Sequence, residues 1–99
     1  MANQEKNKYQ DEILIKQIEE FVTHLSVEKN YALNTVSAYK RDLLKFLSFL
    51  GNKNISGWAE VDGDTVNLFV MGLRHGDISN KSIRRYLSSI RVFYNYLID

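Results

Sequence analysis

A cluster of basic side chains lies near the end of the chain, in residues 80–97, where no acidic residue precedes Asp99. The cluster consists of Lys81, Arg84, Arg85 and Arg91. Read as a helix at about 100° per residue, this segment has an apolar stripe on one side and Lys81, Arg85 and Ser88 on the far side, with Arg84 and Arg91 on one flank. Exposed helices usually mix charges, because opposite charges four residues apart stabilise them. The pattern therefore indicates a helix that lies against an anionic surface.

The same design occurs earlier, over residues 35–50, where an apolar stripe is backed by Arg41, Lys45 and small side chains. Lysine and arginine could neutralise nucleic-acid phosphates and release condensed counterions, and an arginine can also bind a guanine edge. A basic face that only contacts solvent is the plainer alternative. The pattern alone leaves both readings open.

Short polar side chains stand near the start of each basic segment. Asn34 is expected to be the N-cap of a helix that begins at Thr35, and Ser79 or Asn80 that of the last helix. A helix start also offers free N–H groups to a phosphate, so capping and phosphate contact are compatible roles. The candidate contact residues of this kind are Asn34, Thr35, Ser37 and Ser82. Ser88, farther along the last helix, is a further candidate because its small side chain allows close approach to a DNA backbone.

The net charge of the 99 residues is only +1, which taken alone argues against nucleic-acid binding. The charge is unevenly distributed. Residues 31–50 hold three basic side chains and one acidic one, and residues 78–99 hold four and one. Residues 1–30 hold four and six, and residues 51–77 hold two and four. The positive charge thus belongs to the two basic segments.

Composition predicts an all-α fold without a sheet. The chain has no proline to interrupt a helix, and no alternating apolar run or Asn-Gly turn suggests a hairpin. Residues 1–10 are polar and aperiodic and are expected to form a flexible arm before a single domain over residues 11–99. Four main helices are expected, over residues 11–29 and 35–50, from a cap at Asp62 or Asp64 to about residue 75, and over residues 80–97.

Each expected helix has an apolar stripe for the core, and Ile55 and Trp58 are expected to join it from the loop over residues 51–61. In the last helix the expected stripe is Ile83, Leu87, Ile90, Tyr94 and Leu97. Gly51 and Gly76 are expected to end the second and third helices. The outer face of the first helix is acidic, which suggests that it points away from any polyanion.

No chemistry beyond binding is indicated. The chain has no cysteine, hence no disulfide or thiolate metal site, and His24 and His75 lack ligand partners at metal spacing. No metal, cofactor, small-molecule substrate or catalytic residue is expected. Tyr39 and Tyr94 fall on apolar faces, which indicates core packing and not a role as nucleophile. The polar start is not a signal peptide, and no apolar run approaches the roughly 18 residues of a membrane span. We therefore expect a cytoplasmic location.

The order of motifs along the chain resembles the amino-terminal domain of tyrosine recombinases, most closely the Xer and phage-integrase group. The motifs in the first half are the run 21–28, Asn34-Thr35, Ala38-Tyr39-Lys40-Arg41-Asp42-Leu43, Phe46-Leu47 and Phe49-Leu50. Those in the second half are Val61-Asp62, Val66, Phe69, Ser82, Arg84-Arg85, Leu87-Ser88, Ile90-Arg91, Phe93-Tyr94 and Tyr96-Leu97. The resemblance covers residues 13–98.

The resemblance implies a SAM-like bundle of four main helices, a core-binding domain that forms one half of a C-shaped clamp on double-stranded DNA. In that family the second and fourth helices approach the major groove, and they correspond here to residues 35–50 and 80–97. The resemblance also implies that strand cleavage belongs to a catalytic domain beyond residue 99, that the parent protein recombines or integrates DNA as a tetramer of recombinase subunits, and that this chain alone is not an enzyme.

A protein–protein interaction module is the alternative. Its basic faces would meet an acidic partner, and Val92 and Tyr96 would be its exposed anchors. A complete small enzyme is excluded by the lack of a nucleophile–base pair, a metal set or a phosphate-binding loop.

Overall fold

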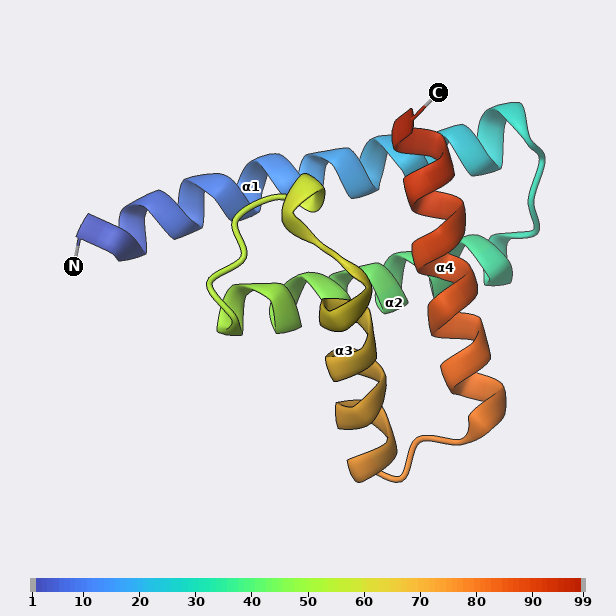
Figure 1. Ribbon diagram of the computed structural model, residues 1–99. Helices are drawn as coiled ribbons and strands as arrows, with labels where there is room; N and C mark the ends of the chain where they lie inside the picture. Colours follow the sequence, from blue (N-terminus) through green and yellow to red (C-terminus); the bar gives the residue numbers. More distant parts are fainter. Residues whose placement is uncertain (1, 99) are drawn as a thin grey trace.

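The computed structural model describes the backbone of residues 2–98 and the side chains of residues 11–98. All regular structure in this range is helical, so the expected all-α fold is confirmed (Figure 1). The elements are α1 (Ala2–Thr23), a π-helical turn (His24–Glu28), α2 (Leu33–Asn52), a 3₁₀ turn (Trp58–Glu60), α3 (Gly63–His75) and α4 (Asn80–Ile98).

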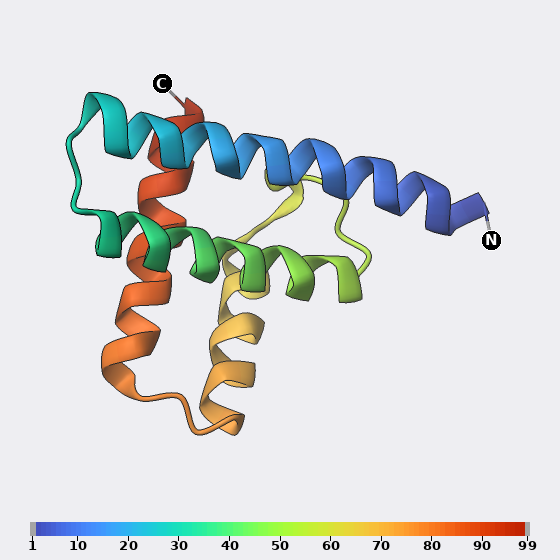
Figure 2. The same ribbon diagram turned by 180° about the vertical axis from the view of Figure 1, so that it is seen from behind.

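The four long helices form two crossing pairs. α1 and α2 lie side by side and run in opposite directions, and α4 crosses both of them (Figures 1 and 2). α3 lies beside the first half of α4, to which a short turn connects it. The two basic segments therefore lie on helices that cross each other.

The first helix is longer than expected. It begins at Ala2 instead of Asp11, and the π-helical turn carries it to Glu28, close to the expected end at residue 29. The flexibility expected of residues 1–10 stays a prediction, because their side chains lie outside the described residues.

The ends of α2 differ from the prediction at both sides. The N-cap is Ala32, whose extended backbone (φ −61°, ψ 144°) starts the helix without a side-chain cap. Asn34 therefore lies inside the first turn, and the prediction that it caps the helix was wrong. Gly51 also lies inside α2, which continues to Asn52. Asn54 follows with φ of 59°, a left-handed conformation that asparagine tolerates better than most residues, so no glycine was needed.

The predicted caps of α3 and α4 are confirmed. The Asp62 carboxylate accepts hydrogen bonds from the Thr65 backbone N–H (2.9 Å) and hydroxyl (2.8 Å), and these bonds lower the pKa of Asp62. The Ser79 hydroxyl accepts from the Ser82 backbone N–H at 3.2 Å. α3 ends at His75 with Gly76 as its C-cap, as the sequence predicted.

Aromatic rings bind the helices into one core. Phe93 of α4 contacts Phe21 of α1 (5.2 Å between centroids) and Trp58 (4.9 Å). One end of α4 is thereby fixed to α1, and the indole N–H of Trp58 donates to Gln17 at 2.9 Å. Tyr94 donates its hydroxyl to the Trp58 carbonyl (2.6 Å), and burial raises the pKa of Tyr94 to about 12. Its role is packing, as expected.

A second aromatic cluster fixes the other end of α4. Phe69 of α3 contacts Phe46 of α2 (5.0 Å between centroids) and Tyr86 of α4 (5.7 Å). The two clusters meet α4 about two turns apart, so both ends of this helix are held by rings from other elements.

The buried face of α4 is rotated relative to the predicted stripe. Ile83 and Ile90 are buried as expected, but Leu87 is 38% exposed. Its place in the core is taken by Tyr86 and Phe93, which are 7% and 0% exposed. The predicted position of Leu87 was therefore wrong, because apolar residues extend around more than half of this helix and only the neighbouring helices decide which of them are buried.

Substitution of Phe93 and of Leu87 by alanine tests this rotation. We expect Phe93→Ala to lower the free energy of unfolding by about 3–5 kcal/mol, since it removes a fully buried ring. Leu87→Ala should change it by no more than about 0.5 kcal/mol, as is usual for surface positions. Urea unfolding followed by circular dichroism measures both. Similar losses in the two variants would contradict the assigned face.

Candidate nucleic-acid interface

Five of the predicted contact residues are exposed cations on α2 and α4. They are Arg41 and Lys45 on α2 and Lys81, Arg84 and Arg91 on α4. The ion pairs formed by side chains of residues 11–98 are His24–Glu28 and Asp42–Arg85. None of the five cations is therefore neutralised by a carboxylate in that range, and their charge is available to an external anion.

The predicted polar contact residues also lie at the surface of the same helices. Asn34, Thr35 and Ser37 are exposed in the first two turns of α2, and Ser82 and Ser88 of α4 are half-buried. The first turn of α2 has no side-chain cap, which leaves its N–H groups free to bind an anion. In both views the first turns of α2 and α4 lie on the same side of the molecule (Figures 1 and 2).

The two basic helices meet at the ring of Tyr86. The Lys45 ammonium of α2 lies 5.8 Å from the ring centroid, and the Arg85 guanidinium of α4 lies 5.2 Å from it. A cation over an aromatic face within about 6 Å is attracted by the ring quadrupole. One cation of α2 and one of α4 thus lie over the same ring. We refer to the exposed cations of these two helices, Arg41, Lys45, Lys81, Arg84 and Arg91, as the cationic patch.

Arg85 has an internal role that the sequence did not predict. Its Nε and Nη2 atoms each donate a hydrogen bond to the Asp42 carboxylate, both at 2.9 Å. These bonds raise the pKa of Arg85, and its side chain is 38% exposed. The expectation that Arg85 belongs to a freely cationic face is corrected: its charge is already paired within the protein.

Asp42, the partner of Arg85, was not among the residues predicted to form the site. Its side chain is fully buried in α2 and also accepts a hydrogen bond from the Ser89 hydroxyl of α4 at 2.9 Å. A signal was present, because Asp42 adjoins the apolar stripe of residues 35–50 between Tyr39 and Phe46. An acid at the edge of a core stripe needs a cationic partner.

The anchors of the alternative function are less exposed than expected. Val92 and Tyr96 are both half-buried and pack against the core. The Tyr96 ring lies 5.2 Å from Phe21 and 5.0 Å from His24. They do not form the exposed apolar surface that a protein–protein module of the expected kind requires.

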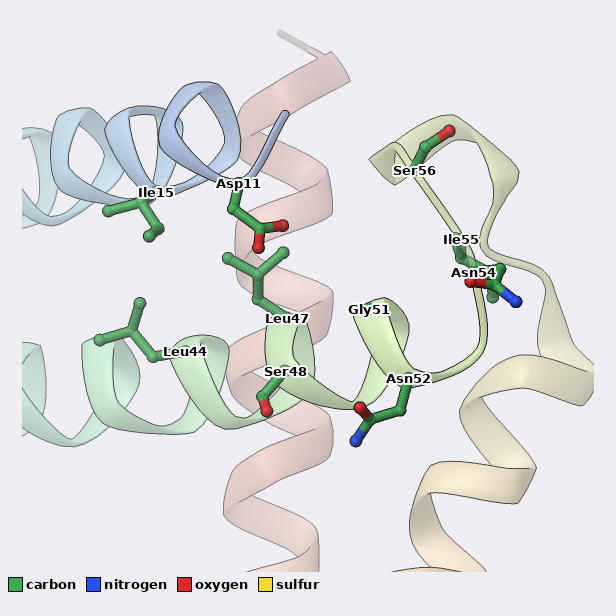
Figure 3. A pocket seen from close by; sticks show the side chains of 10 residues that line it. All are labelled: Asp11, Ile15, Leu44, Leu47, Ser48, Gly51, Asn52, Asn54, Ile55 and Ser56. Carbon is green, nitrogen blue, oxygen red and sulfur yellow. The ribbon is translucent and has the colours of Figure 1, made fainter. Parts of the chain in front are cut away.

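A pocket between α1, the end of α2 and the following loop lies apart from the cationic patch (Figure 3). It is lined by Asp11, Ile15, Leu44, Leu47, Ser48, Gly51, Asn52, Asn54, Ile55 and Ser56. These ten residues include no lysine, arginine or histidine, so the pocket is not suited to an anionic ligand.

In the part of the chain that the structure describes, no group of three His, Cys, Asp or Glu side chains could hold a metal ion. None of the helices in that part combines the length and apolar character needed to cross a bilayer.

Comparison with known proteins identifies the relatives of this chain. It is 32% identical to the tyrosine recombinase XerC of Roseiflexus castenholzii over 82 residues, which are 83% of this chain and 26% of that protein. It is 36% identical to the XerC of Anoxybacillus flavithermus over 78 residues, 79% of this chain and 26% of the relative. It is also 34% identical to the XerC of Listeria welshimeri over 80 residues, 81% of this chain and 27% of the relative.

The chain thus spans about a quarter of the length of these curated relatives. No solved structure matches it significantly. The model of the phage integrase N-terminal SAM-like domain matches residues 18–99, which include both basic helices and the ion pair that joins them. The chain belongs to the family of phage integrase N-terminal SAM-like domains.

Proposed function

We propose that this chain binds double-stranded DNA through α2 and α4, as the core-binding domain of a tyrosine recombinase. The observation that carries the proposal is the set of five exposed cations on two crossing helices, none paired with a carboxylate of residues 11–98. Such cations bind phosphates and release counterions. Membership of the phage integrase N-terminal SAM-like family supports DNA as the anion that this surface binds.

The distribution of acids supports one orientation of the duplex. The outward side of α1 carries three exposed glutamates, Glu12, Glu19 and Glu20, and Glu28 is exposed at the end of the π-helical turn that follows. These would repel phosphates, whereas α2 and α4 attract them. The duplex would therefore lie against the cationic patch and away from α1.

The polar residues at the start of the helices would complete the interface. Asn34, Thr35 and Ser37 would bond phosphates near the uncapped first turn of α2, and Ser82 and Ser88 would do so along α4. Arginines of the patch could in addition contact guanine edges in the major groove. In this account the phosphate contacts position the domain, and a smaller number of base contacts provides sequence preference.

The activity of a whole recombinase is a further part of the proposal. We infer that a full-length protein of this kind clamps its core site between this domain and a separate catalytic domain. Strand cleavage would reside in the catalytic domain, and recombination or integration would take place in a tetramer in the cytoplasm. The XerC relatives, of which the chain spans about a quarter, support this division of roles.

Salt dependence provides the first test. With four to five phosphates contacted, a plot of log affinity against log salt concentration should have a slope of roughly −3.6 to −4.5, at about −0.9 per phosphate. Fluorescence anisotropy with a short labelled duplex measures it. Absence of binding at low salt, or a slope near zero, would contradict the proposal.

A single-residue substitution tests whether the duplex lies on the cationic patch. Arg84→Ala should weaken binding and reduce the steepness of the salt dependence by about 0.9, the loss of one phosphate contact. Arg74→Ala is the matched control, since Arg74 is exposed on α3 and its loss changes net charge equally. The expected slope of the control equals that of the unmodified chain. Equal effects of both substitutions would indicate attraction by net charge alone.

A further inference from the structure

A buried polar cross-link joins α2 to α4. The fully buried carboxylate of Asp42 receives two hydrogen bonds from Arg85 and one from Ser89, each 2.9 Å long. The Ser89 hydroxyl also lies 3.0 Å from the Arg85 carbonyl, an acceptor one helical turn away. Every buried side-chain polar atom in the described residues has a partner. The cross-link is therefore complete, and it uses two consecutive turns of α4.

The value of such a pair for stability alone is limited. A buried ion pair pays a large desolvation penalty, and well-packed apolar residues of similar volume often replace it without loss. Apolar cores also tolerate repacking, whereas a guanidinium that binds both oxygens of a carboxylate has one favoured geometry. The strongest consequence of this pair is that it fixes how α2 and α4 are placed relative to each other.

Each member of the pair directly follows an exposed cation in the sequence. Arg41 precedes Asp42 on α2, and Arg84 precedes Arg85 on α4. Successive residues of a helix point about 100° apart, so the directions of Asp42 and Arg85 determine those of Arg41 and Arg84. A rotation of either helix would change the spacing between cations that must match successive phosphates.

We propose that Asp42 and Arg85 are positioning residues for DNA binding, which hold the cations of α2 and α4 at the spacing of a duplex backbone. This inference rests on the proposed function. Arg85 acts through Asp42 and not as one of the phosphate contacts, and Ser89 completes the cross-link.

The direction in which Asp42→Asn changes DNA affinity separates a positioning role from electrostatic attraction alone. Asp42→Asn removes a negative charge and frees Arg85, so electrostatics alone predicts tighter binding to DNA. Positioning predicts weaker binding, on the order of tenfold, because a shared hydrogen-bond network is disrupted. The two explanations therefore predict opposite changes in affinity.

Two further variants keep the net charge of the chain unchanged. Arg85→Lys retains the cation but loses the two-pronged contact, and the double variant Asp42→Asn with Arg85→Gln removes one charge of each sign. Both should bind the labelled duplex on the order of tenfold more weakly, with a salt slope like that of the unmodified chain. If Arg85 contacted a phosphate directly, the slope of the double variant would fall by about 0.9 instead.

Stability must be separated from affinity. Anisotropy is therefore measured at a temperature where circular dichroism shows each variant to be fully folded. Leu73→Ala is the control, because it removes a buried side chain of α3 and leaves the cross-link intact. It should lower the unfolding midpoint without weakening DNA binding. Should Asp42→Asn fail to fold, Arg85→Lys tests the same prediction with the carboxylate in place.

Three results would overturn the inference. Unchanged or tighter binding by folded Asp42→Asn and Arg85→Lys would show that the pair serves stability alone, while binding by the unmodified chain would leave the proposed function standing. Equal weakening by Leu73→Ala would assign the loss to general destabilisation. No binding by the unmodified chain would overturn both the proposed function and the positioning role.

Discussion

A carboxylate shielded from solvent must find its positive charge and hydrogen bonds within the protein, and in this domain that requirement determines where α2 meets α4. Asp42 meets it with Arg85 and Ser89, which lie one turn apart on α4. The same rotation of α4 that brings these two residues to Asp42 buries Tyr86 and Phe93 and leaves Leu87 at the surface. The ion pair and the two aromatic clusters are thus all satisfied by one orientation of α4.

That orientation decides which charges reach the surface. Arg84 and Arg91 are exposed on α4, while Arg85, which follows Arg84, is paired with the buried Asp42. A chain with a net charge of only +1 can still attract a polyanion in this way, because most of its acids lie in residues 1–30 and 51–77. The helices α2 and α4, in contrast, expose five cations that no carboxylate of residues 11–98 neutralises. Local charge, set by the packing of the helices, is the property relevant to DNA binding.

Much of the fold follows from local patterns in the sequence. The apolar stripes of α1 and α2 and the caps Asp62 and Ser79 depend on neighbouring residues, and the structure confirms them. The predicted face of α4 was wrong because Leu87 and Phe93 are equally apolar, and only rings from other helices select between them. Arg85 could not be separated from the other cations because its partner lies 43 residues away. Left-handed residues such as Asn54 replaced the glycine expected at the end of α2.

Backbone amide chemical shifts recorded during a DNA titration would show where the duplex lies on the domain. Because the cationic patch lies on α2 and α4, we expect shift changes and line broadening confined to residues 34–48 and 81–91, with α1 and α3 largely unaffected. Changes centred on the acidic side of α1, or spread evenly over all four helices, would contradict it.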